Sequence, residues 1–415
     1  MRILHFADLH IGVENYGRID SSTGLSTRLM DFLGALDEVV EYSITEKVDL
    51  VLLAGDTYKN RDPSQTQQRE LAKRLSKISK AGIPIFLLVG NHDLPHGAGK
   101  ATSIDIFDTL RVPNIHIGDE LKTFTIDTPS GPLQIVSVPW PKRSQLLTRE
   151  ETRGMPIEEV NERIQYLFST GIKLAANQLD PNIPAILTGH LTISGATLGS
   201  ERSMILGQDH FLMPSDIHLP EFDYIALGHI HRHQILRQDP MMVYAGSLQR
   251  VDFGEEGDKK GFCVIELKSE LKQGKRLTDF TFHEVKAREF ITIDIEIEKT
   301  IQDPNSEVIN AISKHTVNDA IVRVRIYLDT EHSTQLDENS IRESLSEAHF
   351  ITSITRHLKD DERRTRVPAD LMEKSSTMEA LGIYLDSRNT DSETKNTLMN
   401  VAKDLIDSEL SDSEE

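Results

Sequence analysis

Residues that can bind divalent metal ions follow five separate apolar stretches within the first 231 residues of the chain. They occur in the sequences Asp8-Leu9-His10, Gly55-Asp56, Gly90-Asn91-His92-Asp93, Gly189-His190 and Gly228-His229-Ile230-His231. Carboxylate and amide oxygens combined with imidazole nitrogens suit Mn²⁺ or Fe²⁺ and tolerate Zn²⁺, whereas a structural zinc site would call for thiolates. Two such ions lower the pKa of a shared water and hold the scissile phosphate. The pattern therefore predicts metal-assisted hydrolysis of a phosphoester.

The spacing within these sequences fits a shared site. Asp8 and His10 are two residues apart, so on an extended segment both side chains point to the same side. Gly55 allows a tight backbone turn directly before Asp56. Because a carboxylate can bridge two cations and an imidazole nitrogen cannot, Asp56 is the expected bridging ligand. Asn91 offers a neutral carbonyl oxygen. The remaining expected ligands are imidazoles, from His190, His229 and His231.

The segments that would position these residues alternate between two patterns. Continuous apolar runs at residues 2–7, 49–54 and 84–89 predict short buried strands. Between them, a helix capped by Ser26 is expected to run to about Glu46, and a second helix from Gln65 to Lys80. This alternation predicts a parallel sheet covered by helices, and the carboxyl ends of its strands would share one edge.

The rest of the chain predicts a second sheet and a smaller unit. Residues 114–140 are expected to form short antiparallel strands, with a turn at Pro129-Ser130-Gly131. Further elements of this part are a helix at 157–179 and strands at 185–188, 224–227, 243–247, 262–267 and 280–285. From about residue 288, isoleucines and valines alternate with polar residues, which predicts strands at 291–297 and 322–328 around a helix at 308–315. A charged linker at 356–366 then leads to an acidic helical tail, with Leu398, Val401, Ala402, Leu405 and Ile406 at helical spacing.

Composition limits the possible environments and partners. No apolar run reaches 18 residues, so no membrane span is expected, and the amino-terminal segment lacks the layout of a signal peptide. Cys263 is the single cysteine, and its apolar neighbours favour a buried strand residue over a reactive thiol. A reducing, cytoplasmic compartment is the expectation. Because the net charge is −20, any surface that binds nucleic acid must be local.

The full set of metal-binding sequences resembles the calcineurin-like metallophosphoesterase superfamily over about residues 1–265. More narrowly, the opening Met-Arg-Ile-Leu-His-Phe-Ala-Asp-Leu-His-Ile-Gly, together with Val138-Pro139-Trp140 and Tyr244-Ala245-Gly246-Ser247, resembles the SbcD family, the nuclease subunits of bacterial SbcCD complexes. The resemblance implies an α/β, four-layer fold with two mixed β-sheets flanked by helices, a small α/β cap domain and a carboxy-terminal helical tail. The implied boundaries are 1–285 for the nuclease domain, 286–358 for the cap, and 359–415 for the linker and the partner-binding tail.

The resemblance also implies roles for individual residues. One metal ion would be held by Asp8, His10, Asp56 and His231, and the other by Asp56, Asn91, His190 and His229. Both are expected to be Mn²⁺, with Fe²⁺ or Zn²⁺ as alternatives. His92 would not bind metal; it would steady the developing charge or protonate the leaving 3′ oxygen, and Asp93 would orient it.

The activity that the resemblance implies is 3′–5′ exonuclease and single-strand or hairpin endonuclease cleavage of DNA. It would serve double-strand-break and hairpin processing in DNA repair, recombination and replication, in association with the nucleoid. The implied partners are DNA ends and hairpins, an SbcC-type coiled-coil ATPase bound by the carboxy-terminal helices, and a second copy of the chain. Two other functions stay open: a phosphoesterase for small phosphodiesters or phosphomonoesters, and a scaffold that binds DNA ends with weak activity.

Several polar residues outside the metal-binding sequences allow two interpretations each. Arg18, Lys59 and Arg61 are expected to contact DNA phosphates near the metal edge, although an ordinary solvated surface would also carry such charges. Trp140 could stack on a base, but packing under a loop is the preferred interpretation. The tail helices could pack back on the chain, yet their low hydrophobicity favours docking onto a partner.

Overall fold

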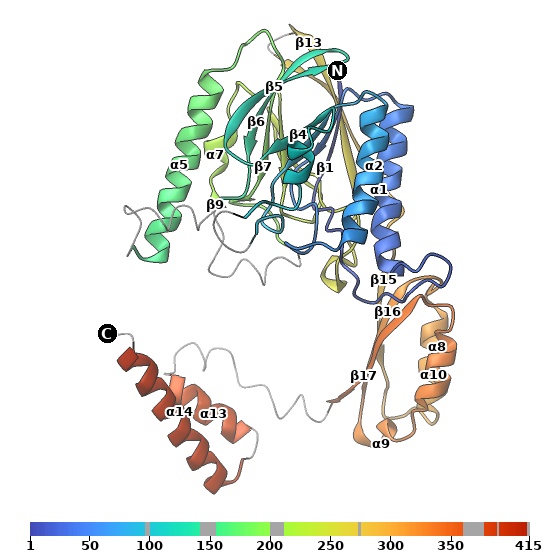
Figure 1. Ribbon diagram of the computed structural model, residues 1–415. Coiled ribbons are helices and arrows are strands. Elements are labelled where there is room, and N and C mark those ends of the chain that lie inside the picture. The colour runs from blue at the N-terminus through green and yellow to red at the C-terminus, as the bar shows by residue number, and fades with distance from the viewer. Residues whose placement is uncertain are drawn as a thin grey trace. The chain divides into compact units, whose positions relative to one another are not determined.

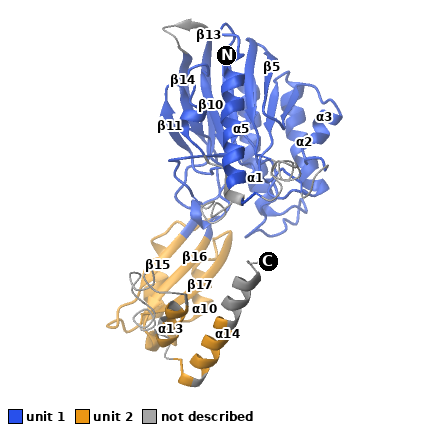
Figure 2. Cartoon of the chain, turned by 90° about the vertical axis from the view of Figure 1, so that its left-hand side faces the viewer, with its two compact units in different colours: residues 1–291, 319–321 blue, residues 292–318, 322–415 orange. Residues whose placement is uncertain are grey.

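The structure is a computed structural model that describes residues 1–95, 100–141, 155–199, 211–272, 275–359, 377–387 and 390–412. The chain divides into two compact units (Figure 2). Unit 1 consists of Met1–Ile291 with Asp319–Ile321, and unit 2 of Thr292–Asn318 with Val322–Glu415. No helix in the described part of the chain combines the length and the apolar composition that crossing a membrane requires.

The first sheet of unit 1 contains the three parallel strands that the sequence predicts. Its strands, in spatial order, are β14 (Lys275–Glu284), β13 (Gly261–Lys272), β1 (Arg2–Phe6), β2 (Leu50–Leu53), β3 (Ile85–Leu88) and β4 (Ile115–Gly118). The strands β1 to β4 run parallel, and Val51 of β2 pairs with Leu4 on one side and Ile85 on the other. The hairpin of β13 and β14 adds to β1 in antiparallel direction. The carboxyl ends of β1, β2 and β3 therefore lie at one edge.

The second sheet also has parallel strands at its centre. Its strands, in spatial order, are β11 (Gln234–Gln238), β12 (Met241–Tyr244), β10 (Tyr224–Gly228), β7 (Ala185–His190), β6 (Gly131–Val138) and β5 (Lys122–Thr128). The strands β12, β10, β7 and β6 are parallel, whereas β11 and β5 are antiparallel edge strands. The expectation of antiparallel strands throughout residues 114–140 is wrong for β4, which joins the first sheet parallel to β3. The strands expected at 262–267 and 280–285 correspond to β13 and β14, which belong to the first sheet and not to the second sheet, where the sequence analysis places them.

Three apolar clusters show how the layers of unit 1 are stacked. Along β1, Ile3 contributes to the cluster between the two sheets, whereas its neighbour Leu4 belongs to the cluster under the helices α1 (Thr27–Thr45) and α2 (Gln65–Lys80). A third cluster lies between the second sheet and α5 (Ile157–Asn177). The order helix, sheet, sheet, helix is visible in Figure 1 and confirms the expected four-layer α/β fold.

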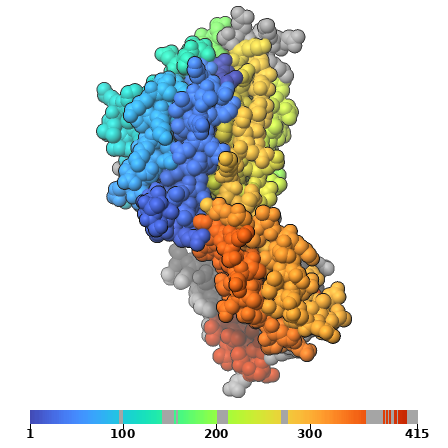
Figure 3. All heavy atoms as spheres, turned by 90° about the vertical axis from the view of Figure 1, so that its right-hand side faces the viewer, coloured from blue at the N-terminus to red at the C-terminus, as the bar shows by residue number. Residues whose placement is uncertain are grey.

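Helix boundaries follow the capping residues. The helix α2 begins after Ser64, whose hydroxyl accepts a hydrogen bond from the backbone of Gln67 in a reciprocal capping box. The helix α1 begins after Ser26 as expected, but the side chain of Ser26 makes no capping hydrogen bond. Figure 3 shows α1 beside the hairpin of β13 and β14, where the ring of Tyr42 contacts Phe262. The shorter elements of unit 1 are α3 (Asp105–Thr109), β8 (Thr192–Ile193), β9 (Phe211–Leu212), α7 (Pro214–Ile217) and the 3-10 helix η1 (Phe253–Glu255).

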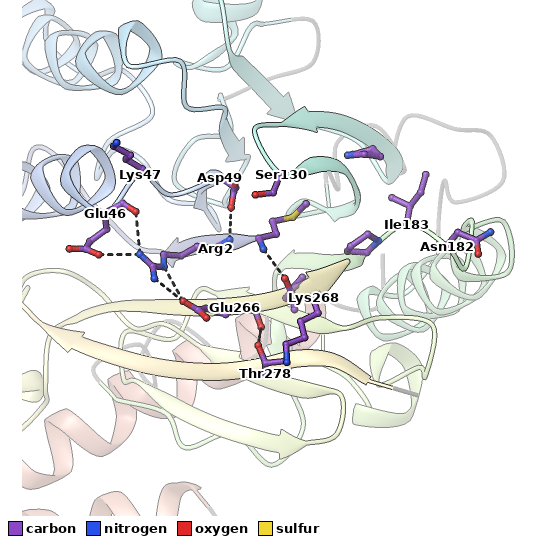
Figure 4. Close-up of a pocket in the computed structure, with 14 residues that line it drawn as sticks. Arg2, Glu46, Lys47, Asp49, Ser130, Asn182, Ile183, Glu266, Lys268 and Thr278 are labelled. Carbon is purple, nitrogen blue, oxygen red and sulfur yellow. Dashed lines mark hydrogen bonds and ion pairs between the residues drawn. The ribbon is translucent and has the colours of Figure 1, made fainter. Parts of the chain in front are cut away.

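A cleft of about 810 Å³ lies at the amino-terminal end of β1, and Arg2 contacts three acidic residues that line it (Figure 4). The guanidinium of Arg2 contacts Glu46 at 3.0 Å and Glu266 at 2.8 Å. The backbone amide of Arg2 donates to Asp49 at 2.6 Å. These contacts fix the start of β1. They therefore help to position Asp8 and His10, which follow the carboxyl end of the same strand.

The elements from residue 290 onward agree only in part with those expected from the sequence. The elements from residue 290 onward are β15 (Phe290–Glu296), α8 (Pro304–Ser313), β16 (Ile321–Leu328), α9 (Thr330–Ser333), α10 (Glu338–Ser344), β17 (Phe350–Leu358), α13 (Thr377–Ser387) and α14 (Ser392–Asp412). The strands form a sheet in the order β15, β16, β17. The strand β17 was not predicted from the sequence, and Arg356, which belongs to this strand, was expected in a linker. The cause is that β17 is partly exposed along its length and lacks an alternating burial pattern.

Candidate metal centre

The expected metal ligands lie together at the carboxyl ends of strands from both sheets of unit 1. In the first sheet, Asp8 and His10 follow β1, Asp56 follows β2 and Asn91 follows β3. In the second sheet, His190 ends β7, and His229 and His231 follow β10. Hydrogen bonds from the amides of Asp8 and His10 to the carbonyls of Gly55 and Asp56 hold the first two loops side by side.

The backbone at this edge adopts conformations that side chains other than glycine rarely take. Four of the expected ligands have positive φ angles: Asp8 at 51°, His10 at 45°, Asp56 at 55° and His229 at 93°. Such conformations cost about 1–3 kcal/mol each and persist where the surrounding structure fixes them, often at functional sites. The strained backbone therefore occurs at the residues whose side chains form the site.

Two glycines allow the ligand side chains to approach each other. A β-carbon on Gly55, whose φ is 95°, would lie 2.1 Å from Nδ1 of His190. A β-carbon on Gly90 would lie 2.2 Å from Oδ1 of Asp56. Both contacts are far shorter than van der Waals distances. The glycines that precede Asp56 and Asn91 are therefore part of the geometry of the site.

The first group of ligand atoms belongs to Asp8, His10 and His231, all buried. Nε2 of His10 lies 2.9 Å from Nε2 of His231. Nδ1 of His231 lies 2.7 Å from the carboxylate of Glu255. Since that carboxylate can only accept, Nδ1 carries the proton and the lone pair of Nε2 is directed into the site.

The second group surrounds the side chain of Asn91. Its Oδ1 atom lies 3.0 Å from Nε2 of His190 and 3.2 Å from Nδ1 of His229. The other ring nitrogen of His190 donates to the carbonyl of Ala54 at 2.8 Å, so its Nε2 is the atom that faces the site. An amide oxygen and two imidazoles thus converge on one point.

The carboxylate of Asp56 lies between the two groups. Its Oδ2 atom is 3.7 Å from Nε2 of His10 and 3.3 Å from Nε2 of His190, and its Oδ1 accepts from the backbone of His92 at 2.9 Å. Burial opposes ionisation of Asp56, but the charges of His190 and His92 outweigh it and hold its pKa well below the usual range. This is the position required of a bridging ligand.

The donor set fits two divalent cations. Three clusters have ligand atoms within 4.8 Å of one another: Asp8 with His10 and His231, His10 with Asp56 and His92, and Asp8 with Asp56 and His190. Burial lowers the pKa of His190, but the carboxylates of Asp56 and Asp8 together raise it to about 9. A cation beside these carboxylates would replace that proton, which is the usual competition between protons and metal ions for one site.

His92 and Asp93 have different partners from those expected. The ring nitrogen Nδ1 of His92 lies 2.8 Å from the carbonyl oxygen of Lys59, so that carbonyl, and not Asp93, orients the ring. Asp93 accepts hydrogen bonds from the backbone amides of Gly90 at 3.0 Å and Thr57 at 3.1 Å. Burial and the nearby charge of Asp56 raise the pKa of Asp93 to about 7. Asp93 therefore joins the loops after β2 and β3.

Sequence reasoning missed two charged residues next to the ligands. Glu255, which contacts His231, and Lys260, which lies 2.7 Å from Glu255, are both fully buried. Glu255 is followed by Glu256 and Gly257 in a polar stretch, without an apolar run before it. No local signal separates it from a surface acid.

The residues expected to contact DNA differ in their surroundings. Arg18 is exposed, and Lys59 and Arg61 are half-buried. Burial lowers the pKa of both His10 and His92, and the charge of Lys59 adds to this shift. The backbone carbonyl of Lys59 contacts the ring of His92, which places this residue beside the centre. Most basic residues of α2 pair instead with two acids: Arg69, Lys73 and Arg74 contact Glu70, and Arg74 and Lys77 contact Asp37.

The half-buried ring of Trp140 lies at the edge of the centre. Its centroid is 4.8 Å from that of His229 and 6.2 Å from that of His190. Packing against ligand residues is therefore part of its role. The neighbouring basic residues Lys142 and Arg143 lie outside the described residues.

Comparison with known proteins agrees with this chemistry. Residues 1–233, more than half of the chain, match the family described as calcineurin-like phosphoesterase. The chain belongs to this family. It is thus a metallophosphoesterase, a hydrolase of phosphoesters from a family that binds two divalent metal ions.

Two solved structures are similar to the chain. One is a dimetal phosphatase from Danio rerio, with 10% identity, a TM-score of 0.35, and coverage of 64% of this chain and 92% of that one. The other is the protein TT1561 of Thermus thermophilus, with 12% identity, a TM-score of 0.32, and coverage of 68% of this chain and 98% of that one.

Proposed function

We propose that the chain is the Mn²⁺-dependent DNA nuclease subunit of an SbcCD-type complex, with 3′–5′ exonuclease and single-strand or hairpin endonuclease activity. The observation that carries the hydrolytic part is the carboxylate of Asp56 between two groups of ligands. When bound, two cations would supply a water of lowered pKa and neutralise charge on the phosphate. The ligands would be Asp8, His10, Asp56 and His231 for one ion, and Asp56, Asn91, His190 and His229 for the other.

His92 is the proposed proton donor to the leaving oxygen. Because Nδ1 donates to the carbonyl of Lys59, the tautomer and the ring orientation are set, and Nε2 remains for the substrate. The ring packs edge-on against His10, with centroids 4.9 Å apart. Burial lowers the pKa of His92, so a proton that it accepts is readily released to the alkoxide of a leaving 3′ oxygen.

A polymeric, anionic substrate is supported by the charges around the centre. Lys59 is half-buried and its backbone carbonyl contacts the ring of His92, and Arg18 is exposed on the loop before α1. Such groups position a phosphate backbone without selecting a base sequence. The paired charges on α2 make that helix a poor second contact surface, so the proposed DNA contacts are limited to Arg18, Lys59 and Arg61.

The proposed ATPase partner is a coiled coil that docks on the tail helices. In α14, Leu398 and Val401 are three residues apart on one helix face and about half exposed. An apolar helix face of this kind is suited to packing against the helices of a partner. The chain is also proposed to act as a homodimer, and light scattering on the purified protein tests that state.

A nuclease assay with full-length protein tests the proposal. Linear duplex and hairpin DNA are incubated with Mn²⁺ or Mg²⁺, with and without a cognate SbcC-type ATPase. Cleavage with Mn²⁺, and altered cleavage when the ATPase hydrolyses ATP, are the expected results. Hydrolysis of bis(p-nitrophenyl) phosphate with DNA left intact would identify a small-molecule phosphodiesterase instead. DNA binding without hydrolysis of either substrate would identify a scaffold.

A further inference from the structure

The carboxylate of Glu255 contacts a ring nitrogen of His231, although Glu255 is not itself among the expected metal ligands. It ends the 3-10 helix η1, 24 residues beyond His231, and is fully buried. Its Oε1 atom lies 2.7 Å from Nδ1 of His231. A buried carboxylate at this distance accepts the Nδ1 proton, so the lone pair of Nε2 is fixed toward the metal centre and His10.

The second oxygen of Glu255 has its own partners. Oε2 lies 2.7 Å from Nζ of Lys260 and accepts from the backbone amide of Val251 at 3.1 Å. Lys260, which is also buried, donates to the carbonyl of His231 at 3.1 Å and to the hydroxyl of Ser247 at 3.0 Å. One ammonium therefore holds both the carboxylate and the backbone of the residue that the carboxylate orients.

The short helix that carries Glu255 is fixed in place within unit 1. Before it, the side chain of Asp252 accepts from the amide of Gly254 at 2.7 Å. The ring of Phe253 packs edge-on against Phe290 at 5.0 Å and Tyr16 at 6.0 Å between centroids. Glu255 is thus held by its helix as well as by Lys260, and the ring of His231 cannot turn without breaking its hydrogen bond to Glu255.

His190 shows by contrast what the carboxylate adds. Its Nδ1 donates to the main-chain carbonyl of Ala54, a neutral acceptor. A carboxylate acceptor gives the imidazole more negative character and makes Nε2 a stronger ligand. The two groups of ligands are therefore unequal, because His231 is supported by a full negative charge and His190 is supported by a neutral carbonyl.

We infer that Glu255, held by Lys260, is a positioning residue that sets the affinity of one of the two metal sites, the one formed by Asp8, His10, Asp56 and His231. This inference rests on the metal centre of the proposed function and is independent of the substrate. It adds a pair of charged residues to the centre that the ligand sequences do not contain.

Titration of the metal-free, full-length protein with Mn²⁺ tests the inference without any assay of cleavage. Calorimetry gives the affinity of each binding event, and electron paramagnetic resonance distinguishes a single Mn²⁺ from a coupled pair. In Glu255→Gln, one binding event weakens by about 10- to 100-fold, the other stays unchanged, and the coupled signal needs correspondingly more Mn²⁺. The control Glu284→Gln, which removes an exposed partner of Lys259, leaves both events unchanged.

A second variant separates positioning from stability. Glu255→Gln leaves the buried charge of Lys260 with Asp258, 3.8 Å away, in place of its closer partner, which can destabilise the fold. Glu255→Gln combined with Lys260→Met removes both charges. This double variant must still weaken the same Mn²⁺-binding event that Glu255→Gln weakens. The inference is overturned if both events keep wild-type affinity in Glu255→Gln, if both weaken together, or if the double variant recovers wild-type affinity. Failure of the metal centre itself would differ, since the wild-type protein would then bind no Mn²⁺.

Discussion

Asp56 is the residue on which both metal sites depend, because its carboxylate lies between His10 and His190. In Asp56→Asn the amide lacks the charge that two cations share, and we expect the loss of both ions. Metal analysis after dialysis against Mn²⁺ measures the number of ions bound per chain. The exposed neighbour provides the control, since Asp62→Asn should bind as the wild type does. Retention of one ion by Asp56→Asn would show that the carboxylate is not shared.

His92 is expected to contribute to the reaction and not to metal binding. His92→Ala removes a side chain whose proposed role is proton donation, so cleavage should fall by about 10²- to 10⁴-fold, the usual range for a lost general acid. Mn²⁺ affinity and DNA binding should change little. Single-turnover cleavage and calorimetry on the same preparation measure both properties. Unchanged cleavage would remove His92 from the mechanism.

His5 provides a test of pH-dependent stability away from the ligands. It is fully buried on β1, with Nδ1 3.0 Å from the hydroxyl of Tyr224, and burial lowers its pKa to about 3. Between pH 6.5 and pH 3 the unfolded chain therefore binds a proton that the folded chain excludes, and stability falls as the pH decreases. From about pH 6 to about pH 4.5 this one residue should cost about 2 kcal/mol.

The comparison of wild type with His5→Gln isolates this effect. Urea unfolding at about pH 7 and at about pH 4.5 gives the free energy of unfolding for both proteins, metal-free. The variant should lose less stability between the two pH values, because glutamine does not titrate. Equal losses in the two proteins would mean that His5 is protonated in the folded chain.

At the scale of elements, the turn after β2 sets the distance between the two sheets at the metal edge. A methyl group at Gly55 would overlap the ring of His190, and the positive φ adds strain. Gly55→Ala should therefore weaken Mn²⁺ binding and lower the free energy of unfolding by at least about 1 kcal/mol. Gly34→Ala, at an open position in α1, serves as the control and should leave metal affinity unchanged. Wild-type affinity in Gly55→Ala would show that the loop can move away without cost.

The elements show which parts of the molecule could be predicted from the sequence. Continuous apolar runs identified β1, β2 and β3, and the helix expected at Gln65–Lys80 corresponds to α2. The ligands were found because each follows such a strand directly. β4 was assigned to the wrong sheet because a single strand carries no signal for its neighbour. The partner of His92 and the role of Glu255 depend on contacts between distant segments, which local sequence does not encode.

At the scale of the whole molecule, partner binding by the tail, as proposed, can be tested separately from hydrolysis. Leu398→Asp combined with Val401→Asp places two charges on the exposed apolar face of α14. Binding of the SbcC-type ATPase should fall at least about tenfold, since burying unpaired charges in an interface costs several kcal/mol. Co-sedimentation and a phosphodiester assay without ATPase measure the two properties, and hydrolysis should be unchanged.

The matched control adds the same charge elsewhere on the helix. Asn396→Asp with Asn400→Asp alters two exposed polar residues of α14 and should bind the ATPase as the wild type does. Equal loss of binding in both double variants would indicate general repulsion by the acidic tail. Unchanged binding in both would place the interface outside this face.

The two sheets supply ligands to the same ions, since Asp56 and Asn91 follow strands of one sheet and His190 and His229 belong to strands of the other or follow them. Bound cations would therefore hold the two sheets of unit 1 together at this edge. A chelator should speed amide hydrogen exchange where β7 and β10 end, and leave the apolar middle of the sandwich protected. The metal would then stabilise the contact between the two sheets in addition to its part in catalysis.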